Sequence, residues 1–215
     1  MPEPGLSGRR AEAARNDQAI LAAARAVFVA NPDAPVSAVA DQAGVGISSL
    51  YRRYRSKEAL LRKLCGDGLQ LYLDIARAAL EDDGAGPWES FATFMARIIE
   101  ADVHTLTRRL AGRFTPTEEL GRAGRIADEL NQQIVARAQS AGVLREDVLP
   151  DDLTFVFEQV ASLHAATPER TAQLRARFLT LQLDGLRAPA RTPLPGPPPT
   201  ATEQRARWNR ALPDH

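Results

Sequence analysis

Apolar residues recur every three or four positions through most of the first 187 residues, which is the spacing of one face of an α-helix. No segment alternates apolar and polar residues convincingly, as a half-buried strand would. Proline and glycine mostly separate the periodic segments. The pattern predicts an all-α protein, with helices over about 11–30, 38–43, 47–54, 57–80, 88–99, 116–141, 151–166 and 168–187.

Residue types mark several of the expected helix ends. Ser37 and Ser56 stand where a hydroxyl can cap the helices that follow. Thr115-Pro116-Thr117-Glu118 has the spacing of a capping box with proline at the first helical position, and Gly142 is expected to end that helix. After residue 187 the chain is rich in proline, which predicts a disordered tail over 188–215, with at most a short helix around 203–208.

Composition places the 215-residue chain among ordinary globular proteins, with 44% hydrophobic and 25% charged residues. It has no apolar run long enough to span a membrane and no apolar N-terminal leader, so we expect a cytoplasmic protein with no membrane partner. The one cysteine, Cys65, excludes an intrachain disulfide, and we expect a buried, unreactive thiol.

Charge is unevenly distributed although the formal net charge is zero. Residues 1–65 carry 10 basic and 6 acidic side chains, whereas residues 66–187 carry 13 basic and 19 acidic ones. A basic N-terminal part on an acidic body indicates that the N-terminal part meets a polyanion.

The segment 35–54 has the features of a helix-turn-helix. Gly44 suits the tight turn, and Ala40, Val45 and Leu50 are spaced to hold the two short helices against the first one. Outward positions, which can reach phosphates or base edges, are filled by serine, arginine, lysine and tyrosine. The alternative is a solvated helical hairpin with surface arginines. The candidate DNA contacts are Ser37, Ile47, Ser48, Ser49, Tyr51, Arg52, Arg53, Tyr54 and Lys57.

These residues carry a resemblance to a known family. Ile20-Leu21-Ala22-Ala23-Ala24, Phe28, Ser37-Ala38-Val39-Ala40, Ala43-Gly44-Val45, Leu50-Tyr51-Arg52-Arg53-Tyr54 and Ser56-Lys57-Glu58-Ala59-Leu60 together resemble the DNA-binding domain of the TetR family of transcriptional regulators. The resemblance covers residues 10–65, with the helix-turn-helix at about 35–54. It implies phosphate contacts from Ser37, Tyr51, Tyr54 and Lys57, and a recognition helix that carries Ile47, Ser48, Ser49 and Arg52.

The resemblance also implies an all-helical homodimer whose regulatory domain, residues 66–187, binds a small molecule and dimerises. Family members are mostly repressors that a ligand releases from a palindromic operator in double-stranded DNA. Four features depart from the common family pattern, namely Gly46, Ser48, Arg53 and the pair Asn31-Pro32. No known operator sequence can therefore be transferred to this chain.

The last predicted helix carries apolar residues over more than the single face that a terminal helix needs. In the last helix, Leu174, Phe178 and Leu181 form one stripe, and Leu179, Leu183 and Leu186 form another. We expect one stripe to meet a second copy of the chain, although both could be buried within one chain. The candidate dimer interface comprises Leu153, Val156, Val160, Leu163, Leu174, Phe178 and Leu181, with Phe157 beside them.

Candidates for an effector pocket lie in the middle helices, although residues of this kind are more often plain core. They are Trp88, Phe91, Met95, Ile99, His104 and Phe157. His104 and His164 are expected to be structural, and no metal or cofactor is expected. The sequence lacks nucleophile-elbow, zinc-protease, paired-cysteine and phosphate-loop motifs, so an enzyme is disfavoured. The other rival is a helical interaction protein that no longer reads an operator.

Overall fold

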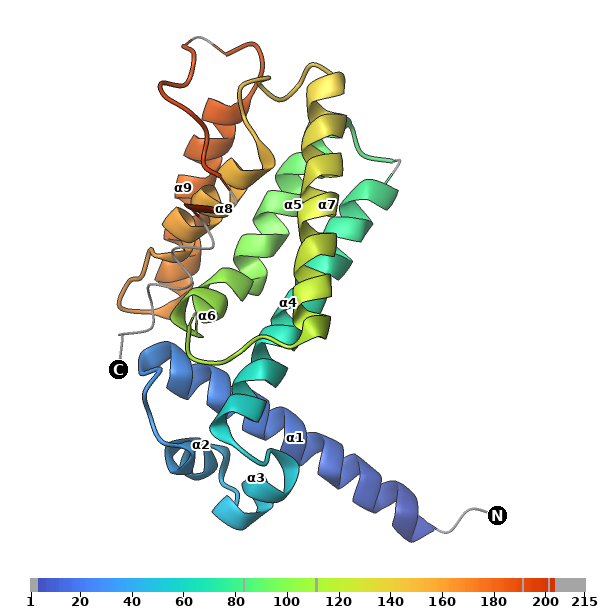
Figure 1. The fold of residues 1–215 in the computed structure, drawn as a ribbon, viewed down its shortest axis with the longest axis vertical. Helices are drawn as coiled ribbons and strands as arrows, with labels where there is room; N and C mark the ends of the chain where they lie inside the picture. The colour runs from blue at the N-terminus through green and yellow to red at the C-terminus, as the bar shows by residue number, and fades with distance from the viewer. Residues whose placement is uncertain (1–3, 83, 111, 191, 201, 204–215) are drawn as a thin grey trace.

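The structure is a computed structural model, and it describes residues 4–82, 84–110, 112–190, 192–200 and 202–203 (Figure 1). These residues contain nine helices and no strand. The helices are α1 (Pro4–Ala30), α2 (Val36–Ala43), α3 (Ile47–Arg53), α4 (Lys57–Glu81), α5 (Pro87–Ala101), α6 (Val103–Leu110), α7 (Glu118–Ser140), α8 (Pro150–Ala161) and α9 (Pro168–Leu186). The prediction of an all-α protein is confirmed.

Two hydrophobic cores are stacked along α4, which runs from one into the other (Figure 1). The N-terminal core joins α1, α2, α3 and the first half of α4, and α6 closes it with Leu106 and Leu110. The second core fills the space between the rest of α4 and α5, α7, α8 and α9. Leu64 and Cys65 belong to the first core and Tyr72 and Leu73 to the second, so the division falls near residue 66 of α4.

Two caps differ from the sequence prediction. α2 begins at Val36 after Pro35, and no side chain caps it, so Ser37 is not its N-cap. α7 is capped by Thr117, whose hydroxyl accepts a hydrogen bond from the Leu120 N–H at 3.3 Å. Thr115 does not cap α7, because its backbone is bound to Glu58 and Arg62 of α4. Ser56 caps α4 as predicted, accepting from the Ala59 N–H at 3.1 Å.

α6 is absent from the sequence prediction, and α8 is shorter than predicted. Asp102 adopts a left-handed backbone conformation, with φ 51°, which ends α5 and allows α6 to start in a new direction. α8 ends at Ala161 because the buried Arg175 guanidinium donates to the Ala161 and Leu163 carbonyls, at 2.8 and 3.2 Å. The expectation that this helix continues to residue 166 is wrong.

The start of the proline-rich segment is bound to the C-terminal part of the molecule, beside the second core. Arg145, which is buried, pairs with Asp147 and donates to the Thr192 carbonyl at 2.6 Å. Asp147 also accepts from the Leu194 N–H at 2.9 Å, and these bonds hold its pKa far below the usual range. Residues 192–194 thus have fixed partners within the segment predicted to be disordered. Most of the short helix considered around 203–208 lies outside the described residues.

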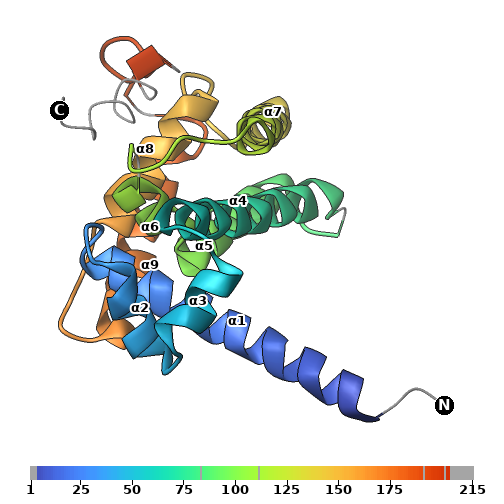
Figure 2. The same ribbon diagram turned by 60° about the horizontal axis from the view of Figure 1, so that its bottom comes forward.

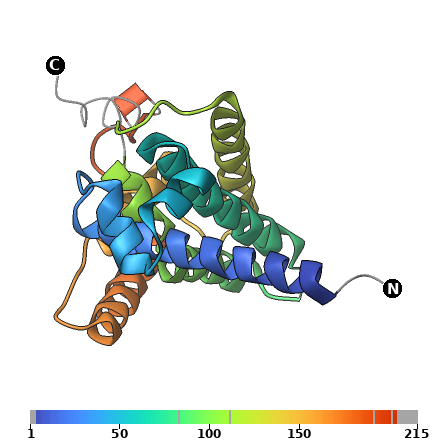
Figure 3. The same ribbon diagram turned by 90° about the horizontal axis from the view of Figure 1, so that it is seen from below.

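The two cores are also joined by polar contacts outside α4. Arg25 of α1 donates to the Ala101 and Asp102 carbonyls at 3.1 and 2.6 Å. Arg113, in the loop before α7, pairs with Asp33 in the loop before α2, and so fastens the α6–α7 loop to the N-terminal core. Seen from below, α2 and α3 lie beside α1 and α4 at the end of the molecule away from α7 (Figures 2 and 3). No described helix is both long and apolar enough to cross a membrane.

Candidate nucleic-acid interface

The turn between α2 and α3 has the geometry that the glycine predicts. Gly44 lies in the left-handed region, with φ 66° and ψ 30°. Its N–H donates to the Asp41 carbonyl at 3.2 Å, and the next N–H, of Val45, donates to the Ala40 carbonyl at 3.0 Å. A residue with a Cβ would be strained there, so the glycine sets the angle between the two helices.

The outer face of α3 carries the side chains that the sequence places on a recognition helix. Ile47 is 40% exposed and Tyr51 is 46% exposed. Ser48 and Arg52 are exposed as well, and Ser49 is half-buried. The opposite face holds Leu50, which is fully buried. This arrangement offers a hydroxyl, a guanidinium, a phenol and an apolar side chain on one convex surface.

The N-terminus of α3 has no side-chain cap. Gly46 takes the N-cap position, and its carbonyl accepts from the Ser49 N–H at 2.9 Å. The remaining N–H groups of the first turn carry the positive end of the helix dipole. The glycine at this place therefore leaves α3 with donors that suit a phosphate.

Arg53 and Tyr54 have partners within the chain. Asp17 of α1 accepts from Arg53 Nε at 2.8 Å and from the Tyr54 hydroxyl at 2.7 Å, both at Oδ1. The bond from Arg53 holds the pKa of the Asp17 carboxyl below its usual value, and burial raises the pKa of Tyr54. Tyr54 is only 8% exposed, so its hydroxyl faces the protein.

Lys57, the first residue of α4, is likewise engaged. Its ammonium donates to the Ala34 carbonyl at 2.8 Å and lies 5.1 Å from the centre of the Phe28 ring. Burial lowers the pKa of Lys57. The side chain thus fixes the loop before α2 against α1. Ser37 is exposed on α2 near this loop.

The predicted effector-pocket residues form packed core. Trp88, Phe91, Met95, Ile99 and Phe157 are all buried in the second hydrophobic cluster. The His104 ring stacks on Phe157 with centroids 4.8 Å apart, and the Tyr72 ring meets its edge at 5.9 Å. His104 Nε2 is buried without a hydrogen-bond partner among the described residues, and burial lowers the His104 pKa to about 4.

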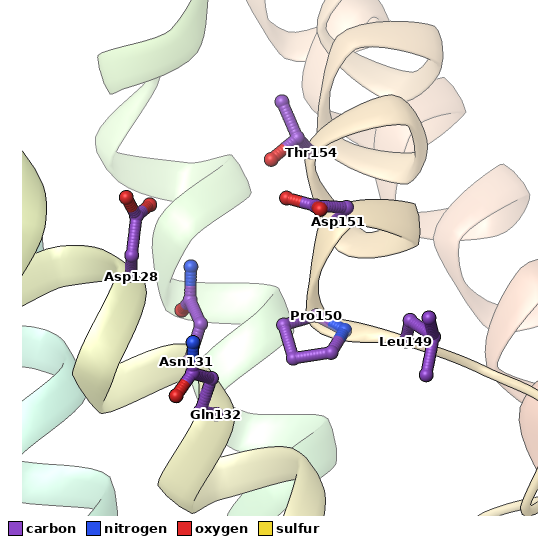
Figure 4. A pocket seen from close by; sticks show the side chains of 7 residues that line it. All are labelled: Asp128, Asn131, Gln132, Leu149, Pro150, Asp151 and Thr154. Carbon is purple, nitrogen blue, oxygen red and sulfur yellow. The ribbon is translucent and has the colours of Figure 1, made fainter. Parts of the chain in front are cut away.

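A cavity of about 280 Å³ opens elsewhere, between α7 and the start of α8 (Figure 4). Its lining is partly polar, with two carboxylates, and partly apolar, and none of it was predicted from the sequence. Asn131, on its inner side, accepts from the Tyr72 hydroxyl at 2.6 Å. Tyr72 thus lies between the cavity and His104. The lining residues are Asp128, Asn131, Gln132, Leu149, Pro150, Asp151 and Thr154.

The candidate dimer residues divide into an inner and an outer set. Leu153 and Val160 of α8 are buried within the chain, as is Phe157. Val156, Leu163 and Leu174 are half-buried. Phe178 and Leu181 on the outer face of α9 are 42% and 57% exposed. An outer apolar stripe therefore remains on α9, while Leu179 holds the inner stripe against the core.

Cys65 is buried in the N-terminal core, as expected. Burial raises its pKa to about 12, which makes the thiol a poor nucleophile at neutral pH. The described residues contain no cluster of three or more side chains able to hold a metal ion.

Family profiles match both the N-terminal and the C-terminal part of the chain. The family profile described as bacterial regulatory proteins, tetR family, matches residues 20–64. The profile described as transcriptional regulator SbtR-like, C-terminal domain, matches residues 86–188. No protein of curated function matches.

Several solved structures are similar to the chain. A TetR transcriptional regulator from Streptomyces coelicolor is 26% identical, with a TM-score of 0.55, over 80% of this chain and 99% of its own. A TetR regulatory protein from Mycobacterium vanbaalenii is 27% identical, with a TM-score of 0.55, over 83% and 99%. A ketosteroid transcriptional regulator of Mycobacterium tuberculosis, at 20% identity, shares the fold with a TM-score of 0.62 over 80% and 95%.

Proposed function

Because the chain belongs to the TetR family of transcriptional regulators, we propose that it is a repressor whose homodimer binds a palindromic operator and leaves it when a small molecule binds. The exposed face of α3 is the observation that carries this proposal. Ser48, Tyr51 and Arg52 project from a helix that Gly44 and Leu50 fix in place. A major groove about 12 Å wide admits such a helix.

The contacts divide into two kinds. Arg52 and Ser48 lie on the outward face and read base edges. A guanidinium can donate two hydrogen bonds to guanine, and a serine hydroxyl can either donate a hydrogen bond to a base or accept one from it. Tyr51, Ser37 and the N–H groups at the start of α3 bind phosphates and set the register. Arg53 reaches a phosphate from the end of the helix. Tyr54 and Lys57 support the interface mainly from within, since both have partners in the chain.

The effector enters between α7 and α8 and displaces the packing around His104. Two observations support this route, namely the cavity lined by Asn131 and the unpartnered Nε2 of His104 beyond Tyr72. A mainly apolar molecule with one polar group for His104 fits an aromatic surrounding of this kind. The α7–α8 cavity alone is at the low end of the volumes that small-molecule sites have.

The homodimer forms through the outer stripe of α9. Phe178 and Leu181 are exposed on adjacent turns of α9, and Val156 of α8 and Leu163, which follows that helix, are half-buried. A twofold axis across this surface gives an isologous interface. Two recognition helices related in this way fit half-sites roughly 34–36 Å apart on one face of the duplex.

The test is a gel shift and footprint of the purified protein on the DNA that flanks its own gene, over a salt series. A protected palindrome, with affinity that falls steeply as salt rises, is the expected result. Salt-sensitive binding at every sequence alike would contradict operator reading. Absence of any binding by the folded dimer would favour a helical interaction protein instead.

A further inference from the structure

Asp17 occupies an unusual place on α1. Ile20, Ala24 and Phe28 form the buried stripe of this helix, and Asp17 lies on the same stripe one turn earlier. Its side chain is 18% exposed, although its neighbours in sequence, Asn16 and Gln18, are exposed. A carboxylate therefore stands at the edge of the N-terminal core, where the helical pattern alone would accept an apolar residue.

The carboxylate holds the end of α3. Arg53 is the last residue of that helix and Tyr54 follows it, and both donate to Asp17 Oδ1. The Arg53 bond uses Nε, and the side chain is still 53% exposed. Its outer nitrogens thus stay within reach of a phosphate while the carboxylate fixes the plane of the guanidinium.

α3 has few other anchors. Among the described residues of this seven-residue helix, only Leu50 is buried, and no side chain caps its N-terminus. The orientation of its outward face depends on the Gly44 turn at one end and on the Asp17 bonds at the other. Loss of those bonds would leave Leu50 and the Tyr54 ring as the buried side chains that hold the C-terminal half of α3 among the described residues.

We propose that Asp17 is a positioning residue that sets the sequence specificity of this regulator. It fixes the angle at which Ser48 and Arg52 meet the base edges, and it does so at the expense of general DNA affinity, because its negative charge lies beside the helix that faces the phosphates. This inference rests on the proposed function. It assigns to α1, outside the helix-turn-helix, a part in reading the operator.

One experiment distinguishes the effect of Asp17 on sequence preference from its effect on general DNA affinity. Fluorescence anisotropy compares a duplex selected by the wild-type protein from a randomised pool with a scrambled duplex of the same composition. For Asp17→Ala we expect roughly tenfold weaker binding to the selected duplex, the size of effect that follows loss of charge-assisted hydrogen bonds. Binding to the scrambled duplex is expected to stay equal or to tighten, since one negative charge is gone.

Two controls isolate positioning from charge and from stability. Glu12→Ala removes the same charge from an exposed site of α1 and is expected to leave the ratio of the two affinities unchanged. Ile20→Val loosens the same core without touching Asp17, and it too should keep the ratio. Asp17→Asn retains an oxygen for the Tyr54 hydroxyl and should recover part of the lost preference. Circular dichroism melts confirm that each variant is folded at the assay temperature.

The outcomes decide between the two proposals. Suppose that the wild-type protein prefers its selected duplex, and that Asp17→Ala and Glu12→Ala show the same ratio of affinities for the selected and the scrambled duplex. This result would overturn the positioning role of Asp17 and leave the proposed function standing. A wild-type protein without preference for any duplex would overturn the proposed function and the role of Asp17 with it. A fall in the ratio confined to the Asp17 variants supports both.

Discussion

Arg52 and Lys57 hold different positions relative to the exposed face of α3. Arg52 is exposed and donates to the Ser49 hydroxyl at 3.5 Å, whereas Lys57 donates to the Ala34 carbonyl at 2.8 Å. Arg52→Ala is expected to weaken operator binding by about 1–3 kcal/mol and to relax the preference at one base position. Lys57→Ala should weaken operator and scrambled DNA alike. Anisotropy titrations on single-base operator variants measure both, and equal losses for the two variants on every sequence would contradict the assignment.

His104 makes the stability of the protein depend on pH. Its pKa is about 4 in the folded chain, against 6.5 for an ordinary histidine. Below pH 6.5 the unfolded chain therefore takes up a proton that the folded chain does not, and stability falls as the pH drops from 6.5 toward 4. The free energy of unfolding should be about 2–3 kcal/mol lower at pH 4.5 than at pH 7 through this residue.

Urea unfolding at the two pH values tests this account of His104. His104→Phe, which keeps a ring against Phe157, is expected to show a smaller difference between pH 7 and pH 4.5. His164 is exposed, so His164→Phe should behave as the wild type does. A His104 variant with the full wild-type difference would show that another group is responsible.

Residue types and spacing were enough to predict the outward face of α3 and the Gly44 turn, because both follow from local backbone geometry. The partners of Arg53 and Tyr54 could not be predicted in this way. Asp17 is 36 residues from Arg53 in sequence, and only the tertiary fold brings them together. The one available signal was a carboxylate on the apolar stripe of Ile20, Ala24 and Phe28.

At the scale of elements, the junction of α5 and α6 depends on Asp102. Its carboxylate accepts from Arg175 Nη1 at 2.9 Å, and Arg175 is only 8% exposed. Asp102→Ala would leave this guanidinium without its carboxylate and would place alanine in a left-handed conformation. We expect a loss of about 3 kcal/mol in the free energy of unfolding. Asp184→Ala, at an exposed site of α9, should change it by less than about 0.5 kcal/mol.

Chemical denaturation monitored by circular dichroism measures both variants. Similar stabilities for Asp102→Ala and Asp184→Ala would mean that Asp102 is not needed at this junction.

The same junction explains why α6 was missed in the sequence. Asp102 is a non-glycine residue with positive φ, so its residue type does not mark a helix end in the sequence. Its conformation is held by Arg175 and Arg25, which come from distant helices. Long helices with strong apolar faces, such as α4 and α7, were predictable.

At the scale of the whole molecule, the outer stripe of α9 is expected to hold two copies together. Leu181→Asp, with Phe178→Asp as a second variant, should convert the protein to a monomer, because a carboxylate cannot be buried there unpaired. Leu71→Asp on α4 replaces a comparably exposed residue, 44% accessible, and should leave the dimer intact. Sedimentation velocity distinguishes these states. A Leu181→Asp protein that sediments as the wild type does would place the interface elsewhere.

Because α4 runs unbroken through both cores, a tilt of the helix in one core displaces its end in the other. Tyr72 in the second core and Lys57 at the edge of the N-terminal core lie 15 residues apart on one unbroken helix, about 22 Å along its axis. A tilt of about 5° around Tyr72 would displace Lys57 sideways by roughly 2 Å. Such a shift is comparable to the length of a hydrogen bond. Under the proposed function, a small repacking beside Asn131 would therefore misalign the two recognition helices of the dimer on the operator.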